Sequence, residues 1–152
     1  MKTIHIEPFD IVGISVRTTN ENNRAMADIG QLWQRFMSEN IAAQIPNKID
    51  DTVYSVYTDY ESDHTKPYTT ILGCRVKNSD IVPEGFTAKR IKGGNYVVFT
   101  ATGKISEGFI GREWMNIWDA PISRTFTADF EIYDSRARDP ENATVDILVA
   151  VK

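Results

Sequence analysis

The sequence has a single cysteine and only two histidines. One cysteine, Cys74, excludes an internal disulfide framework and a thiolate zinc cluster. Its run, Thr70–Val76, is strand-like, which favours a small buried hydrophobe over a nucleophile. His5 and His64 show no metal-ligand spacing, and we interpret both as solvated or locally bonded imidazoles. We therefore expect no metal site and no cofactor.

Long apolar runs and an excess of positive charge are also missing. No run approaches the roughly 18 residues of a membrane-spanning helix, and residues 1–7 alternate in polarity, unlike a signal peptide. We therefore expect a cytoplasmic protein with no membrane partner. With 17 basic and 21 acidic side chains, the formal net charge is −4, and the basic residues are scattered among acids. This pattern argues against direct nucleic-acid binding, so any role in transcription would need another chain to bind DNA.

What is present is an ordinary globular composition, with 41% hydrophobic residues in 152. This length predicts a single domain over residues 1–152 that buries its own core. Apolar residues recur at three- and four-residue steps between Asn22 and Asn40 and between Ile105 and Trp118, which predicts two amphipathic helices. Strands are predicted at 3–7, 11–18, 53–60, 68–77, 86–91, 96–101, 128–134 and 144–151.

The order strand-helix-strand-strand thus occurs twice, which predicts an α+β fold. Residue identities suggest a repeat, because Gly30-Gln31-Leu32-Trp33 matches Gly111-Arg112-Glu113-Trp114, and Tyr57 matches Tyr133. The pseudo-repeats would cover about 1–80 and 81–152. Such a molecule would have one cleft between its halves, and ligand sites favour such interfaces.

One predicted strand, Ala128 to Asp134, carries an acid among aromatic residues. Alternation places Phe130 and Ile132 on one face and Glu131 with Tyr133 on the other. If the first pair faces the helices, Glu131 faces the opposite side, where the simplest interpretation is a solvated carboxylate.

The corresponding strand of the first half favours a different environment for Glu131. Together with the strand that follows it, it contributes four tyrosines, which make a surface too aromatic for ordinary solvent exposure: Tyr54, Tyr57, Tyr60 and Tyr68. Ring faces attract positive charge, and a carboxylate neutralises it in a pocket of low dielectric constant. This combination indicates a site for an organic cation.

Three further side chains have competing interpretations. Trp33 lies on an apolar helical stripe and is assigned to the core. Trp114 either belongs to the core or has one edge in the cleft, since its stripe runs toward the Glu131 strand. We expect Arg124 to pair with a neighbouring acid such as Asp129 rather than bind a ligand.

Together, several motifs make the sequence similar to a known family. They are Glu113-Trp114, Arg124, Asp129-Phe130-Glu131-x-Tyr133, Tyr54-x-x-Tyr57-x-x-Tyr60 and Thr70-Ile71-Leu72-Gly73. The chain resembles the GyrI-like small-molecule-binding family, which includes the effector-binding domains of AraC-type regulators such as Rob and proteins related to the DNA gyrase inhibitor. The resemblance implies tandem β-α-β-β units, a mostly antiparallel sheet with two main helices, and a central ligand cleft. It also implies that Glu131, with Tyr133 beside it, contacts bulky, often cationic ligands.

The leading hypothesis is a stand-alone domain that binds hydrophobic, preferably cationic aromatic molecules, as a regulator sensor or a sequestering protein. Its expected ligand-binding residues are Glu131, Tyr133, Tyr57, Tyr54, Tyr60, Tyr68 and Trp114. The chain starts at the first family strand and ends at the last, so the DNA-binding module of regulator members is expected to be absent. Two alternatives stay open. One is a hydrolase of electrophilic toxins that uses Glu131 and Tyr133, and the other is a module that restrains a protein partner such as gyrase.

Overall fold

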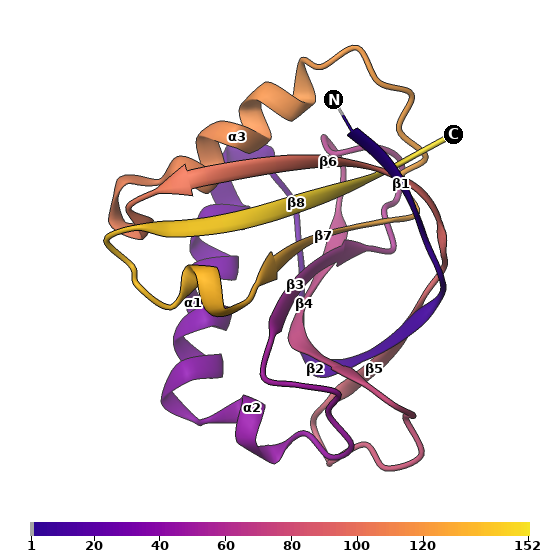
Figure 1. Cartoon of the computed structure of the whole chain (residues 1–152), viewed down its shortest axis with the longest axis vertical. Helices are drawn as coiled ribbons and strands as arrows, with labels where there is room; N and C mark the ends of the chain where they lie inside the picture. Colours follow the sequence, from indigo (N-terminus) through magenta and orange to yellow (C-terminus); the bar gives the residue numbers. More distant parts are fainter. Residues whose placement is uncertain (1) are drawn as a thin grey trace.

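The structure is a computed structural model that describes residues 2–152 (Figure 1). Its strands are β1 (Lys2–Ile6), β2 (Phe9–Thr18), β3 (Val53–Thr58), β4 (Tyr68–Val76), β5 (Thr87–Ile91), β6 (Gly94–Gly103), β7 (Ala128–Tyr133) and β8 (Ala143–Val151). Its helices are α1 (Arg24–Ser38), α2 (Ile41–Gln44) and α3 (Phe109–Trp118), with single 3-10 turns η1 (Glu21–Asn23), η2 (Ile105–Glu107) and η3 (Ser135–Ala137). The predicted α+β fold with two β-α-β-β units is confirmed. The short helix α2 was not predicted, and the second predicted helix begins as η2.

All strand pairings are antiparallel, in the order β1-β6-β8-β7-β3-β4-β2-β5. One unit contributes β2-β4-β3 and the other β6-β8-β7, so the two units meet at the β3/β7 pair. Outward from this pair, the first unit continues with β4 and then β2, and the second unit continues with the corresponding strands β8 and then β6.

The sheet curls back on itself at its ends. β1 and β2 follow each other across a short bend, and so do β5 and β6. On one side of the bends β1 pairs with β6, ending at Ile6 and Gly94, and on the other side β2 pairs with β5, starting at Phe9 and Ile91. At the bend, a Cβ on Gly93 would lie 2.4 Å from the carbonyl oxygen of Ile6, so only glycine fits there. Mutual pairing covers edges that would otherwise be free to pair with other chains.

Apolar side chains fill both sides of the curved sheet. The inner face holds a core cluster that includes Phe9, Ile11, Val56, Ile71, Ile91, Tyr96, Phe130 and Leu148. On the outer face, α1 packs on β2 and β4, whereas α3 packs on β6 and β8. The two helices lie on the same side of the sheet, and the central β3/β7 pair lies between their packing sites (Figure 1).

This arrangement decides the orientation of β7, which the sequence pattern left conditional. Phe130 faces the inner core rather than the helices, and Glu131 points to the face that carries them. The reason is that closure of the sheet creates an apolar interior of its own, which takes the hydrophobic side of β7. Although α1 and α3 pack on the strands to either side, Glu131 is buried on this face, where Trp114 of α3 reaches its carboxylate.

The remaining core and surface features are simple. Cys74 is fully buried beneath α1, as predicted, and burial raises the pKa of its thiol to about 11.

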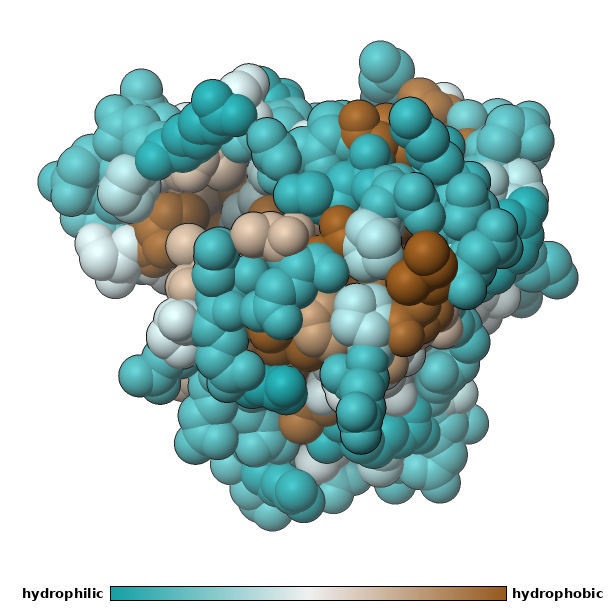
Figure 2. All heavy atoms as spheres, turned by 90° about the horizontal axis from the view of Figure 1, so that it is seen from below, coloured by the Kyte–Doolittle hydropathy of each residue, from teal (hydrophilic) through white to brown (hydrophobic). Residues whose placement is uncertain are grey.

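On the face in Figure 2, hydrophilic residues dominate and apolar side chains reach the surface in small separate patches. Among residues 2–152, none of the helices has the length and apolar character needed to cross a membrane.

Candidate functional site

Glu131 is buried at the centre of the site, with 2% of its surface exposed. Three neutral donors hold its carboxylate. The Tyr57 hydroxyl and the Trp114 indole Nε1 donate to Oε2 at 2.7 and 2.6 Å, and the Tyr133 hydroxyl donates to Oε1 at 2.6 Å. Burial raises the pKa of Glu131, and the three hydrogen bonds oppose that rise.

The donors themselves stay protonated at neutral pH. Burial, followed by the nearby Glu131 carboxylate, raises the pKa of both Tyr57 and Tyr133 well above the usual value for tyrosine. The same two causes raise the pKa of Tyr68 to about 12. Within residues 2–152, no basic side chain forms an ion pair with Glu131. In its ionised form the Glu131 carboxylate is therefore hydrogen-bonded but has no basic partner among the described residues.

Asp129, two residues earlier on β7, has a different environment. It is fully buried, and the Arg124 guanidinium donates to Oδ2 at 2.8 Å, which confirms the predicted pair. The Tyr60 hydroxyl donates to the same oxygen at 2.6 Å, and the Ala150 backbone N–H donates to Oδ1 at 2.8 Å. Asp129 is thus a compensated structural acid, in contrast to Glu131.

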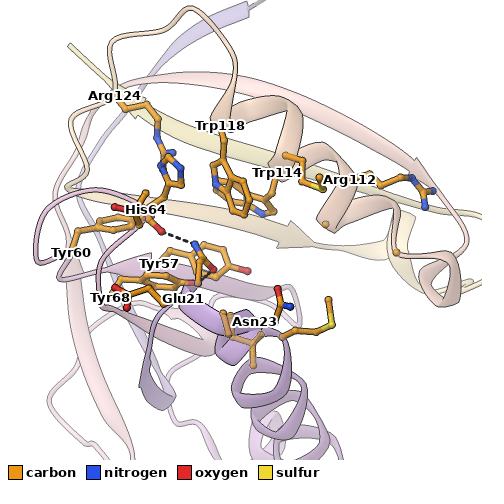
Figure 3. A pocket seen from close by; sticks show the side chains of 18 residues that line it. Glu21, Asn23, Tyr57, Tyr60, His64, Tyr68, Arg112, Trp114, Trp118 and Arg124 are labelled. Atoms are coloured by element: carbon orange, nitrogen blue, oxygen red, sulfur yellow. Dashed lines mark hydrogen bonds between the residues drawn. The ribbon is translucent and has the colours of Figure 1, made fainter.

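A cavity of about 830 Å³ opens between the two helices beside this cluster (Figure 3). Its walls come from α1 and the segment before it, from the β3–β4 connection, and from α3. The lining residues are Asn20, Glu21, Asn23, Ala25, Met26, Ile29, Tyr57, Tyr60, His64, Thr65, Tyr68, Gly108, Gly111, Arg112, Trp114, Met115, Trp118 and Arg124. Aromatic and thioether side chains make up much of this wall, which suits an apolar aromatic ligand.

Tyr57 and Trp114 connect the cavity to Glu131. Both side chains line the cavity, both donate to the carboxylate, and their rings pack edge to face with centroids 5.4 Å apart. The Tyr68 and Tyr57 ring centroids are 6.0 Å apart. Glu131 therefore lies behind the Tyr57 and Trp114 side chains, where a low dielectric constant lets a carboxylate charge act on the cavity.

The structure groups most, but not all, of the predicted site residues. Tyr57, Tyr60, Tyr68 and Trp114 line the cavity, while Glu131 and Tyr133 do not reach its surface. The expected grouping of Tyr54 with these residues is wrong. Tyr54 and Tyr57 are three positions apart on β3, so alternation sends them to opposite faces. Tyr54 instead packs in the inner core, with its ring 5.9 Å from Phe9 and 6.0 Å from Phe130.

Two aromatic side chains of the cavity were missed from the sequence. His64, interpreted as a solvated or locally bonded turn residue, stacks on Trp118 with ring centroids 5.0 Å apart and planes 12° apart. This contact joins the β3–β4 connection to the end of α3. Trp118 carried a signal, since it ends an apolar helical stripe, but the position of His64 depends on a contact between distant segments.

The remaining predictions concern Trp33 and bound ions. Trp33 packs against Phe36 and Tyr133, at 6.1 and 4.9 Å between ring centroids, as the core assignment predicted. In the part of the chain that the structure describes, no group of three or more His, Cys, Asp or Glu side chains could hold a metal ion.

The aromatic cavity between the two helices is the kind of concave, largely apolar site in which proteins bind small molecules. The sequence profile of the Cass2 family, the integron-associated effector binding proteins, matches residues 4–151, and the chain belongs to this family. The resemblance to GyrI-like proteins that the sequence indicated is thereby confirmed.

Three relatives illustrate the similarity. YobU of Bacillus subtilis (strain 168), a protein named for transcriptional regulation, is 32% identical over 155 residues, which cover 97% of this chain and 95% of YobU. The Vibrio cholerae integron cassette protein VCH_CASS2 is 33% identical, with a TM-score of 0.75 and coverage of 99% of this chain and 95% of that chain. The structure of SAV2435 bound to tetraphenylphosphonium has a TM-score of 0.76 at 18% identity, with coverage of 99% and 93%, so this likeness concerns the fold alone.

Proposed function

We propose that the cavity binds hydrophobic, aromatic organic cations and that Glu131 supplies the neutralising charge. The observation that carries this proposal is the contrast between the two buried acids of β7. Asp129 has a basic partner in Arg124, whereas Glu131 has none among residues 2–152 and lies directly behind cavity-lining Tyr57 and Trp114. Burying an uncompensated carboxylate costs stability, and a cationic ligand removes that cost.

The dimensions and walls of the cavity support the same ligand class. A volume of about 830 Å³ falls within the range of pockets that hold drug-sized molecules. Tyr57, Tyr68 and Trp114 present rings whose faces attract positive charge. The fold is shared with SAV2435, whose structure holds an organic cation, tetraphenylphosphonium, and this supports testing that ion first.

In the cell, we expect the domain to act as a sensor or a sequestering protein. The name of YobU supports a link to transcription. The acidic balance of residues 1–152 argues against direct DNA binding by this domain, so the sensor role, unlike sequestration, requires DNA contacts made outside it.

The hydrolase alternative would use Glu131 with Tyr133 as an acid–base pair. Both carboxylate oxygens already accept hydrogen bonds from side chains of the protein, and Oε2 accepts two. A general base needs an oxygen within reach of the substrate proton. This geometry favours binding over turnover, and product analysis after incubation with strained electrophiles tests the choice.

The experiment is a titration of wild type and Glu131→Gln with tetraphenylphosphonium and with neutral triphenylphosphine oxide. The shift in melting temperature reports binding. Glu131→Gln keeps the shape of the side chain and removes its charge. The binding free energy of tetraphenylphosphonium should therefore weaken by about 1.5–3 kcal/mol, whereas that of the neutral compound should stay unchanged. Equal weakening of both compounds would contradict the role of charge. No shift with any compound would favour the protein-partner alternative.

A further inference from the structure

Arg124 is a second polar feature of the cavity wall, and its ion pair with Asp129 does not use it fully. Its side chain is 7% exposed and lines the cavity. One terminal nitrogen, Nη2, donates to Asp129, but Nε and Nη1 have no acceptor within residues 2–152. Buried donors of a charged group without an acceptor are costly, so they mark a place where an acceptor is wanted.

Aromatic contacts do not supply the missing acceptor. The Arg124 Cζ lies 4.3 Å from the centre of the Phe126 ring and 5.9 Å from that of Trp114. Stacking uses the flat face of a guanidinium, whereas its N–H groups point outward in its plane. The contacts with Phe126 and Trp114 therefore hold Arg124 in position and leave two of its N–H directions unpaired.

His64 lies on the same wall of the cavity as Arg124. Figure 3 shows the Arg124 guanidinium directed from the wall toward His64 and Trp118. The His64 Nδ1 is buried and also lacks a partner among the described residues. Burial, and then the positive charge of Arg124, lowers the pKa of His64, so the imidazole is neutral at pH 7. Arg124 and His64 both line the cavity, and their unpaired polar atoms lie just beneath one part of its wall.

The charge balance at Arg124 selects the kind of acceptor. Asp129 already neutralises the guanidinium, so a ligand needs no negative charge to bind there. A full carboxylate on the ligand would also be repelled by the uncompensated charge of Glu131. A neutral carbonyl oxygen accepts N–H hydrogen bonds without this repulsion.

We infer that Arg124, with His64 beside it, forms a subsite for a neutral carbonyl oxygen, so that preferred ligands carry an ester, amide or ketone in addition to their cationic centre. This subsite rests on the proposed function, because it shares the cavity with the site for the cation. Trp114 separates the two parts: its indole nitrogen donates to Glu131, and its ring lies beside Arg124. The ligand class is then an aromatic cation with a carbonyl on a side group.

Three xanthene dyes that share one cationic core provide the test. Tetramethylrosamine carries an unsubstituted phenyl ring, tetramethylrhodamine methyl ester adds an ester carbonyl to that ring, and tetramethylrhodamine has a free carboxylate instead. Dissociation constants are measured by fluorescence anisotropy at one ionic strength. In wild type, the ester should bind about tenfold more tightly than the rosamine, the effect of one or two hydrogen bonds to a charged donor. The carboxylate dye should bind more weakly than the ester.

Arg124→Lys tests the residue, because lysine keeps a positive charge beside Asp129 but loses the Nε and Nη1 donors. The ratio of rosamine to ester dissociation constants should fall to near one in this variant. If wild type shows no preference for the ester, or if Arg124→Lys keeps it, the subsite is wrong. The wild-type comparison decides even if the variant does not fold.

Glu131→Gln separates the subsite from the proposed function. This substitution should raise the dissociation constants of the rosamine and of the ester by the same factor, so the ratio of the two constants should stay the same. If Glu131→Gln leaves both affinities unchanged while the ester preference persists, the charge proposal fails and the carbonyl subsite stands. If the preference is for the free carboxylate over the ester, the inference of a neutral acceptor is overturned.

Discussion

Ser55 and Glu131 are paired directly across β3 and β7, the two strands where the β-α-β-β units meet. Tyr57 lies two positions after Ser55 on β3, and Tyr133 lies two positions after Glu131 on β7. Because the strands are antiparallel, the two tyrosines lie on opposite sides of the Ser55–Glu131 pair along the strand direction, and both donate to the carboxylate. The spacing that relates Tyr57 to Tyr133 in the sequence also relates Ser55 to Glu131. The two tyrosines therefore occupy equivalent positions in the two units. The residues between them differ, because the second unit has the acidic Glu131 where the first unit has the neutral Ser55.

Cation binding should depend on pH through Glu131. Burial raises the pKa of this carboxyl, so acidification neutralises it at a higher pH than an ordinary glutamate. The affinity for tetraphenylphosphonium should fall as the pH is lowered from 8 to 5, whereas that of Glu131→Gln should stay flat. Titration calorimetry at several pH values measures this, and a flat wild-type profile would contradict the assignment.

The same group should limit the stability of the unliganded protein. A carboxyl whose pKa is raised by folding stabilises the fold fully below its unfolded value of about 4.5, and this contribution is lost as the pH rises through the folded pKa. Glu131→Gln should therefore melt at a higher temperature than wild type at pH 7.5, and the difference should shrink toward pH 4. Differential scanning calorimetry decides, and a lower melting temperature for the variant at pH 7.5 would refute this.

Tyr57 and Tyr54 offer a matched pair of hydroxyl deletions on opposite faces of β3. Tyr57→Phe removes a donor that lowers the pKa of Glu131, so less carboxylate remains ionised near neutral pH. We expect about 2- to 10-fold weaker cation binding and a pH midpoint shifted upward. Tyr54→Phe should change neither quantity, because Tyr54 lies in the inner core. Equal effects of the two substitutions would place the site elsewhere.

Asp129 should matter for folding more than for ligand charge. Asp129→Asn breaks a buried pair and leaves Arg124 without its counter-charge, which costs about 3–5 kcal/mol in the free energy of unfolding. The control is Glu141→Gln in the exposed Lys104–Glu141 pair, which should cost at most about 1 kcal/mol. Urea denaturation measures both, and similar costs would mean that the Arg124–Asp129 pair is not structurally important.

Much of the architecture follows from local patterns in the sequence. The amphipathic stripe around Trp33 determines α1, and alternation determines which residues of β7 share a face, because both depend on neighbours within a few positions. The Arg124–Asp129 pair was predictable for the same reason, since the two residues are only five positions apart. Burial of Cys74 followed from its strand-like surroundings.

What the sequence alone determined is therefore the order of elements, the two β-α-β-β units and only part of the set of residues that form the cavity and its surroundings. Only the tertiary structure decided which faces are covered. Closure of the sheet made a second apolar interior, which took Tyr54 and Phe130 and turned Glu131 toward the helices. It also brought His64 onto Trp118, 54 positions along the chain. The physical reason is that periodicity tells which side chains share a face, whereas the covering of that face depends on contacts between segments far apart in the chain.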